Sequence, residues 1–200
     1  MSGWPALFEV DGDFVSIVPL SMKHKDDLTA AVCDGELYRL WYTKVPRPED
    51  MSAEIERRLS LQAVGSMLPF TIISKTTNKA VGMTSYMNID ALNKRVEIGS
   101  TWYRRSVQRS PLNTECKLLL LQHAFENLGC ICVELRTHFM NTQSRRAIER
   151  LGAKLDGILR SNALMENGAI RDTAVYSIIL SEWPAVKENL RWQLEKPRNV

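Results

Sequence analysis

Apolar and polar positions alternate along the chain in a pattern that predicts seven strands. Segments rich in β-branched and aromatic residues occupy positions 14–20, 68–74, 80–89, 95–103, 130–137, 155–164 and 170–180. A helical period is clearest where Leu118, Leu121, Phe125 and Leu128 follow one another at intervals of three, four and three residues. This stripe predicts a helix that buries one face and ends at Gly129.

Three further helices are predicted from the same periodicity and from signals at their ends. Ser21 fits the N-cap of the first, the second covers about 48–64, and the third covers 141–151. The predicted order is one strand, two helices, three strands, helix, strand, helix and a final hairpin turning at Asn167-Gly168. A strand–helix–strand–helix segment beside antiparallel hairpins indicates a mixed α/β sheet.

Length and composition are those of an ordinary globular protein. The chain has 200 residues, of which 44% are hydrophobic and 24% charged, so we expect one domain over residues 1–200. Its longest aliphatic run, 118–121, is far too short to span a membrane. The first residues lack a basic segment and soon carry Glu9, Asp11 and Asp13, so we expect no signal peptide and a cytoplasmic protein.

The net charge of +3 is unevenly distributed. Residues 94–160 hold 12 Lys and Arg against 6 Asp and Glu, whereas the remainder holds 14 against 17. Two interpretations stay open: solvated helix faces that are basic by chance, or a bound anionic ligand. The charge is too small to indicate nucleic acid, and the basic residues form no recognisable nucleic-acid-binding motif.

Several other classes of site are disfavoured. The four cysteines include no C-x-x-C pair, and the three histidines have no metal-ligand spacing to them, so we expect no metal. The glycine and nucleophile motifs of P-loop proteins, dinucleotide-binding folds and α/β hydrolases do not occur. The remaining candidate is the junction at 103–116, where a strand leads through a basic loop into a helix N-terminus. Free N–H groups there would suit a phosphate, although a solvated arginine loop is the alternative.

Three motifs in this order resemble those of the GNAT N-acetyltransferases, in their RimJ/RimL-type branch. The run 108–115, Gln-Arg-Ser-Pro-Leu-Asn-Thr-Glu, resembles the Q/R-x-x-G-x-G/A loop that is followed by Thr-Glu, and the strand before it holds 96–99, Val-Glu-Ile-Gly. The pattern at 141–152 resembles the N-x-x-S helix that closes with Leu-Gly. Arg171-Asp172 and the later 182–184, Glu-Trp-Pro, are typical of the branch. The resemblance covers about 14–184, followed by a helical tail at 183–196.

The resemblance implies a mixed, mostly antiparallel sheet of seven strands, flanked by about four helices and splayed between strands four and five. It implies acetyl transfer from acetyl-CoA to an amine, with the pantetheine arm along 99–103 and the pyrophosphate over 108–114. The basic surplus would then serve the phosphates of coenzyme A. The residues expected to bind acetyl-CoA are Trp102, Tyr103, Gln108, Arg109, Ser110, Leu112, Asn113, Thr114, Asn141, Ser144 and Arg145. Asn141 also fits a helix N-cap, and it can serve both purposes.

The family mechanism, which the resemblance implies, is direct attack by a neutral amine on the thioester. It needs a base to take the ammonium proton and an acid to protonate or stabilise the departing thiolate. Glu97 is the candidate base, because its strand borders the predicted splay; the alternative is a surface carboxylate paired with Arg95 or Lys94. Many GNAT enzymes carry a tyrosine acid seven residues after the helix asparagine, but this position is Ile148 here. Relatives of the RimJ/RimL type often use a serine, which points to Ser144 as the acid.

Two features leave the activity open. Pro111 stands where the family loop has glycine, and it lacks one N–H for the phosphates, although it suits the first position of a helix. Trp41 and Tyr42 fall where the family lines its acceptor pocket, but they could equally cover the core. We expect a peptide N-terminus or a small primary amine as the acceptor, no membrane or nucleic-acid partner, and a homodimer as one possible assembly. The alternative is a catalytically silent CoA-binding or regulatory module.

Overall fold

The computed structural model describes residues 4–196, and its elements follow the order expected from the sequence. The strands are β1 (Val10–Asp11), β2 (Val15–Pro19), β3 (Met67–Ser74), β4 (Lys79–Asp90), β5 (Arg95–Tyr103), β6 (Cys132–His138), β7 (Lys154–Leu164) and β8 (Ile170–Ile179). The helices are α1 (Lys25–Cys33), α2 (Met51–Ala63), α3 (Pro111–Gln122), α4 (Thr142–Arg150) and α5 (Trp183–Glu195). The predicted domain, 1–200, includes residues 1–3 and 197–200, which lie outside the described range.

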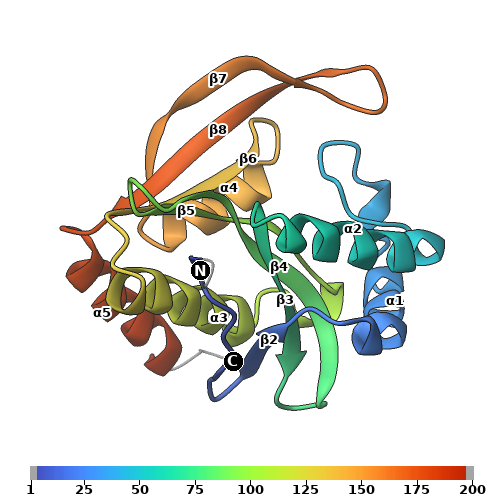
Figure 1. Ribbon diagram of the computed structural model, residues 1–200, viewed down its shortest axis with the longest axis horizontal. Coiled ribbons are helices and arrows are strands. Elements are labelled where there is room, and N and C mark those ends of the chain that lie inside the picture. Colours follow the sequence, from blue (N-terminus) through green and yellow to red (C-terminus); the bar gives the residue numbers. More distant parts are fainter. Residues whose placement is uncertain (1–3, 197–200) are drawn as a thin grey trace.

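All eight strands belong to one sheet, in the order β1-β2-β3-β4-β5-β6-β8-β7 (Figure 1). Every neighbouring pair is antiparallel except β5 and β6, which run parallel. This confirms the predicted mixed sheet. The described residues form eight strands and five helices rather than seven and about four, because the two-residue β1 adds an edge and the predicted tail forms the full helix α5.

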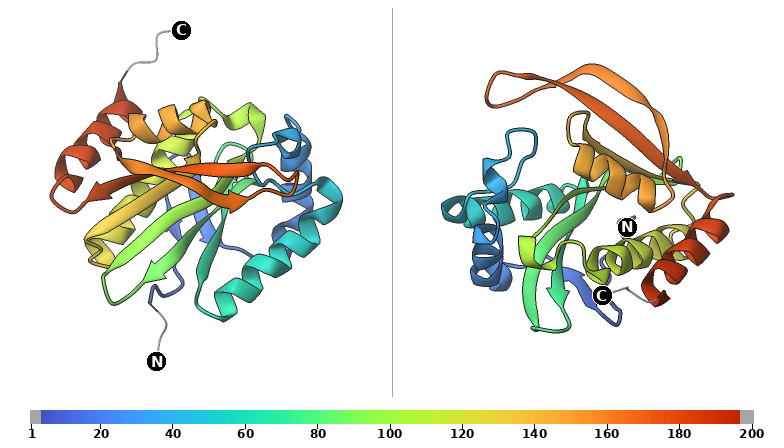
Figure 2. Two further views of the ribbon diagram at one scale, coloured as in Figure 1. Left: turned by 90° about the horizontal axis from the view of Figure 1, so that it is seen from above. Right: turned by 180° about the vertical axis from the view of Figure 1, so that it is seen from behind.

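Helices cover both faces of the sheet and divide the core in two (Figure 2). On one face, α1 and α2 bury Leu28, Val32, Met51 and Ile55 against β4 and β5. On the other face, α3 and α5 bury a larger cluster that includes the predicted stripe at 118–125. The helical pattern of α3 continues through a π-helical turn at His123–Asn127. Among the described residues, no helix is long and apolar enough to cross a membrane.

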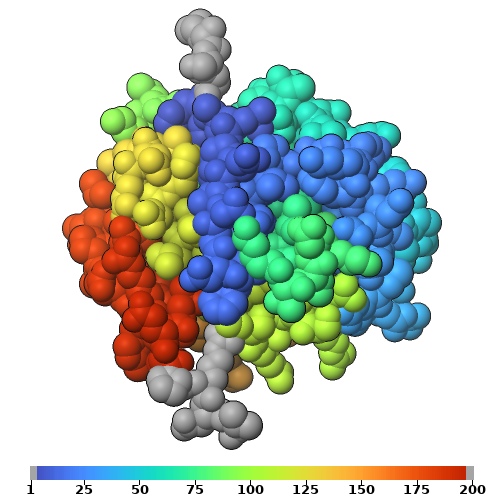
Figure 3. Space-filling view, turned by 90° about the horizontal axis from the view of Figure 1, so that it is seen from below, coloured from blue at the N-terminus to red at the C-terminus, as the bar shows by residue number. Residues whose placement is uncertain are grey.

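The segment before β1 packs along the core instead of extending into solvent. The ring of Phe8 stacks on His123 with centroids 3.6 Å apart and meets Phe70 edge-on at 4.8 Å. Figure 3 shows this segment, in blue, lying across one side of the molecule. The N-terminal segment is therefore tied to α3 before the sheet begins.

The β7–β8 hairpin extends beyond the body of the sheet and bends toward the connection between α1 and α2 (Figures 1 and 2). Glu166, at the turn of the hairpin, pairs with Lys44 of that connection at 3.3 Å. The ion pair joins two segments that are far apart in the chain, and both contribute residues, Lys44 and Asn162, to one cavity.

Candidate active site

The parallel pair β5–β6 is joined over only three residues of each strand. Arg95, Val96 and Glu97 pair with residues 132–134, and no pairing follows between these strands within the described residues, although β5 continues to Tyr103. On its other side β5 is irregular, with a register shift opposite 83–85 and a left-handed residue at Ser100 (φ 48°). The expected splay is present. It leaves the main chain of 98–103 open to a further extended chain on the β6 side.

A cavity of about 880 Å³ opens in this gap. It is lined by β5, β6, the starts of α3 and α4, and the α1–α2 connection. Its lining holds one carboxylate, Glu97, and seven basic side chains: Lys44, Arg109, Lys117, Arg136, Arg150, Arg171 and Lys196. Such a cavity attracts an anionic ligand. Residues 4–196 bring no three His, Cys, Asp or Glu side chains together as metal ligands.

The loop before α3 is organised by its own side chains. Gln108 Nε2 donates to the Tyr103 carbonyl at 3.0 Å, and Arg109 adopts a left-handed conformation (φ 62°). Ser110 is the N-cap of α3, as its residue type predicts, and accepts from the Leu112 N–H at 3.3 Å. Pro111 occupies the first helical position. Pro111 has no N–H, the Leu112 N–H is bonded to Ser110, and the N–H of residue 114 bonds back along the helix. In the first turn, the N–H of Asn113 is therefore the one left to bind an anion.

Glu97 is buried, with only 5% of its surface exposed. Asn88 Nδ2 donates to Glu97 Oε2 at 2.6 Å, and Arg136 Nε lies 3.5 Å from the same oxygen. Burial raises the pKa of Glu97, partly offset by the Asn88 hydrogen bond and the Arg136 charge. The interpretation of Glu97 as a surface carboxylate is therefore wrong: Arg95 pairs with Glu134 instead.

The space in front of Glu97 exists because residue 99 is glycine. A Cβ on Gly99 would lie 2.6 Å from Glu97 Oε1 and 2.7 Å from the Met87 sulfur. Any other residue there would displace the carboxylate. The position of the Glu97 carboxylate therefore depends on glycine at residue 99, just beyond the point where β5 stops pairing with β6.

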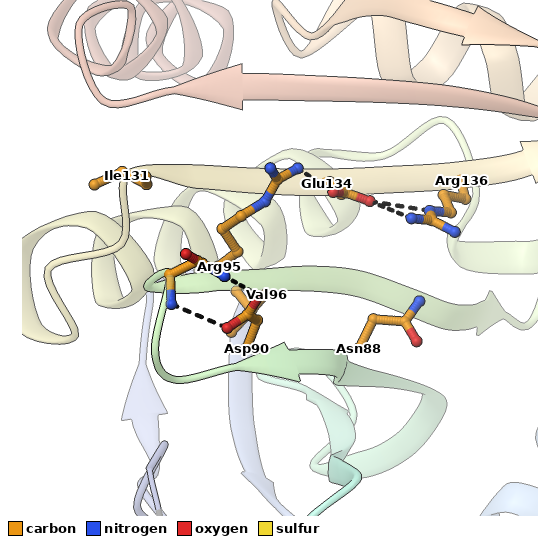
Figure 4. Close-up of a pocket in the computed structure, with 8 residues that line it drawn as sticks. Asn88, Asp90, Arg95, Val96, Ile131, Glu134 and Arg136 are labelled. Atoms are coloured by element: carbon orange, nitrogen blue, oxygen red, sulfur yellow. Dashed lines mark hydrogen bonds and ion pairs between the residues drawn. The ribbon is translucent and has the colours of Figure 1, made fainter.

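A second depression, of about 450 Å³, lies beside Glu97 and Gly99, and the residues that line it hold Arg136 in place (Figure 4). Glu134 accepts from Arg95 and, at 2.7 and 3.0 Å, from Arg136. Arg136 therefore bridges Glu134 in this depression and Glu97 in the cavity. The polar residues of this depression therefore hold Arg136 in the position from which it pairs with Glu97.

The start of α4 faces the cavity from the other side. Asn141 is the N-cap, with its Oδ1 accepting from the Ser144 N–H at 3.0 Å, which confirms its capping role. Asn141, Ser144 and Ile148 all line the cavity. Arg145 instead donates from Nε to the Tyr176 hydroxyl at 2.9 Å and lies over the Phe139 ring.

The cavity brings together most of the residues expected from the sequence. Trp102, Tyr103, Gln108, Arg109, Ser110, Asn113, Thr114, Asn141, Ser144 and Tyr42 line it. Leu112 and Arg145 are absent from the lining, and the Leu112 side chain is buried in the core. Trp41 is half exposed, and its ring lies 5.1 Å from that of His138 at the edge of the cavity.

Several polar residues of the lining were not predicted as site residues from the sequence, among them Lys117, Arg136, His138 and Arg171. Arg171 is partly buried and donates from Nε to Thr173 at 3.0 Å, and burial lowers its pKa. Burial also lowers the pKa of His138, whose Nδ1 accepts from the Met140 N–H. No local motif marks Lys117 and Arg136, which lie within α3 and β6, or His138, which ends β6. Arg171 lies in the Arg171-Asp172 motif near the start of β8, but that motif did not indicate a place in the cavity.

Comparison with known proteins places this geometry in a family. The model of the "Acetyltransferase (GNAT) domain" matches residues 15–154. The solved structure of a GCN5-related N-acetyltransferase from Brucella melitensis is 32% identical, with a TM-score of 0.85 over 95% of this chain and 86% of that one. That of Mycobacterium smegmatis RimJ in complex with CoA-disulfide is 19% identical, with a TM-score of 0.75 over 90% and 88%, and shows the shared fold.

A curated relative from Bacillus subtilis (strain 168), named "Putative ribosomal N-acetyltransferase YdaF", is 32% identical over 106 residues. The match covers 53% of this chain and 57% of that protein. Only part of each chain is thus compared.

Proposed function

The chain belongs to the GNAT acetyltransferase family, and we propose that it transfers the acetyl group of acetyl-CoA to a primary amine by direct attack in a ternary complex. One observation carries the proposal. The pairing of β5 with β6 ends at Glu97, so that an open strand edge begins beside a buried carboxylate in a basic cavity. The open strand edge suits an extended ligand, the basic lining suits an anionic one such as acetyl-CoA, and Glu97 is a base close to both.

In the proposed complex, the pantetheine arm takes the place of the missing strand partner along 99–103. The pyrophosphate lies at the start of α3, where the Asn113 N–H and Arg109 are available. The thioester then lies toward Gly99, with Asn141 and Ser144 facing it from α4. The free main-chain edge, the helix start and the positive lining each match one part of acetyl-CoA.

Glu97 is the proposed base. Its raised pKa makes it a better proton acceptor than an exposed carboxylate, because burial disfavours the charged form. The amine nitrogen attacks the thioester carbon, and Glu97 accepts the proton directly or through a water. Ser144 is placed to donate a hydrogen bond toward the sulfur.

We propose a protein N-terminus or a small-molecule primary amine as the acceptor, entering between Trp41, Tyr42 and the β7–β8 hairpin. The Lys44–Glu166 ion pair joins the two segments that border this entrance. The name of the Bacillus subtilis relative, which refers to ribosomal N-acetylation, supports a protein N-terminus. The homodimer stays a prediction that sedimentation equilibrium can test.

The second candidate is a CoA-binding module without turnover, favoured by Pro111 and by Ile148 in place of a tyrosine. Release of the CoA thiol from acetyl-CoA, measured against a panel of primary amines and short peptides, separates the two. Acetylated product with any acceptor, identified by mass spectrometry, supports the enzyme. CoA binding with no product from any acceptor supports the module.

A further inference from the structure

Lys117 is enclosed by protein, and no carboxylate of residues 4–196 pairs with it. It lies on the second turn of α3 with 5% of its surface exposed, yet it lines the acetyl-CoA cavity. Within residues 4–196, its Nζ has one hydrogen-bond partner, the Thr101 hydroxyl at 3.1 Å, and no ion pair. A buried charge is costly unless it is paired, so this amine is unusual enough to indicate a functional role.

The Lys117 amine is linked by hydrogen bonds to Gly99, the residue toward which the proposed thioester lies. Thr101 Oγ1, which accepts from Lys117, lies 3.3 Å from the Gly99 carbonyl and donates to it. These contacts tie Lys117 to the bend of β5 at 99–101, just beyond the last residue paired with β6. On the adjacent turn of α3, Asn113 lines the same cavity four residues earlier, so both side chains lie on one helix face.

Lys117 and Glu97 approach this bend from opposite faces of the sheet. Val96 and Ile98 pack into the cluster beneath α3, and side chains alternate along a strand, so Glu97 points to the face of α1 and α2. Lys117 comes from α3 itself. The cavity therefore has an acidic group on one side of β5 and a basic group on the other.

We propose that the Lys117 ammonium gives a proton to the departing thiolate of coenzyme A. This inference rests on the proposed acetyl transfer. The acceptor nitrogen forms a bond to the thioester carbon, the carbon–sulfur bond breaks, and its electron pair goes to sulfur. Glu97 takes the proton from nitrogen, and Lys117 supplies one to sulfur. Solvent then removes the proton from Glu97 and returns one to Lys117, so that protons balance.

The acid–base properties of Lys117 agree with this role. Burial lowers the pKa of Lys117 from 10.5 to about 8, and the adjacent Cys116 opposes the shift slightly. This value is close to the ~8.5 of an ordinary thiol, so proton transfer to the thiolate is nearly balanced in free energy. The ammonium form still predominates at neutral pH. The other ionisable side chains that line the cavity are Tyr42, Glu97, Tyr103, His138, Lys44, Arg109, Arg136, Arg150, Arg171 and Lys196.

Lys117 also provides the general acid that the sequence motifs did not clearly identify. Ile148 cannot donate a proton, and the Ser144 hydroxyl does not ionise near neutral pH, so Ser144 can only stabilise the sulfur by a hydrogen bond. Lys117 supplies an ionisable acid from α3 instead of from α4.

Two substitutions test the proposal, with an exposed lysine as the matched control. K117M keeps the length of the side chain without the proton, and K117R keeps the charge on a group that does not release a proton in proteins. We expect both to lower kcat by roughly 10²–10⁴-fold while the Kd of CoA changes little, and K79M to match the wild type. The alkaline limb of the kcat profile near pH 8 should disappear in both.

A second readout does not need turnover. The ultraviolet absorbance of the thiolate reports the ionisation of bound CoA, and we expect the thiol to ionise at lower pH in the wild type than in K117M, because the ammonium stabilises the thiolate. Equal thiol titrations overturn the proposal even if the enzyme is active. A K117R variant that keeps full kcat, or a K117M variant that loses only CoA affinity, also overturns the proposal. Either result would mean that Lys117 binds the anionic cofactor and does not donate a proton.

The two proposals fail in different ways. If the wild type binds CoA but acetylates no amine, the proposed function fails, while a lower thiol pKa in the wild type still supports the place of Lys117 beside the sulfur. If CoA does not bind at all, both fail together.

Discussion

The carboxylate of Glu115 fills the space in which Gly12 would carry a side chain. A Cβ on Gly12 would lie 2.4 Å from Glu115 Cδ. The same carboxylate accepts the backbone N–H groups of Asp13, Phe14 and Val15 at 2.7–2.9 Å. The glutamate of the Thr-Glu motif thus fastens the first long strand to α3, about 100 residues away in the chain, and leaves the chemistry to other residues.

Replacing Glu115 should reveal this structural role. In E115Q an amide NH₂ group, which cannot accept a hydrogen bond, replaces one of the two carboxylate oxygens. At least one backbone N–H is then left without an acceptor, and we expect the free energy of unfolding to fall by about 1–3 kcal/mol. Urea unfolding measures the change, with E56Q, at an exposed position of α2, as the control. Equal midpoints for E115Q and the wild type would show that water replaces the lost acceptor.

Glu97 should determine the acid limb of the activity profile. Its pKa is raised, chiefly by burial, so activity that depends on the carboxylate falls as the pH drops through this raised value. We expect E97Q to lower kcat by roughly 10²–10⁴-fold, to flatten the acid limb and to leave the Kd of CoA unchanged. Unchanged turnover at saturating substrate would assign the base role to water or to another residue.

Acetyl-CoA should raise the melting temperature of the protein. A ligand that binds only the folded state stabilises it by about 2.7 kcal/mol at a hundredfold excess over Kd. The basic cavity and the open edge of β5 are the reasons to expect binding. Differential scanning calorimetry measures the shift, and its absence at millimolar acetyl-CoA would contradict both functions considered above.

Pro111 offers a test of the phosphate site. In P111G the first position of α3 gains an N–H, and a hydrogen bond to a charged group contributes about 1.5–3 kcal/mol. The loss of the proline constraint should cost about 0.4–1 kcal/mol of stability. We therefore expect CoA to bind about tenfold more tightly, by isothermal titration calorimetry, with a slightly lower melting temperature. Equal or weaker binding would mean that this position faces away from the phosphates.

Lys117 should reduce stability in a pH-dependent way. A shift of its pKa from 10.5 to about 8 corresponds to about 3 kcal/mol against folding at neutral pH. The sign follows from proton counting: between pH 8 and 10.5 the unfolded state holds a proton that the folded state has lost, so stability rises with pH. We expect K117M to be more stable than the wild type at pH 7, with the difference shrinking toward pH 10 in urea unfolding. A constant difference would show that Lys117 titrates normally.

The sequence by itself determined the elements and their ends. Regular spacing placed the strands and helices, and Ser110, Pro111 and Asn141 take the helix-start positions that their residue types predict. These features depend on backbone geometry within a few residues, so a local pattern contains the information. The order of elements together with the loop motif was enough to identify the family.

Only the tertiary structure decided which polar side chains act together. Glu97 meets Arg136, 39 residues away, because β5 and β6 pair for three residues in one register. Lys117 stands within an apolar helix, where the sequence gives no reason to separate it from a solvated lysine; its enclosure depends on how α3 lies against the bend in β5. Burial, and with it the pKa of each group, is set by atoms brought from distant parts of the chain, and a local pattern contains no record of those atoms.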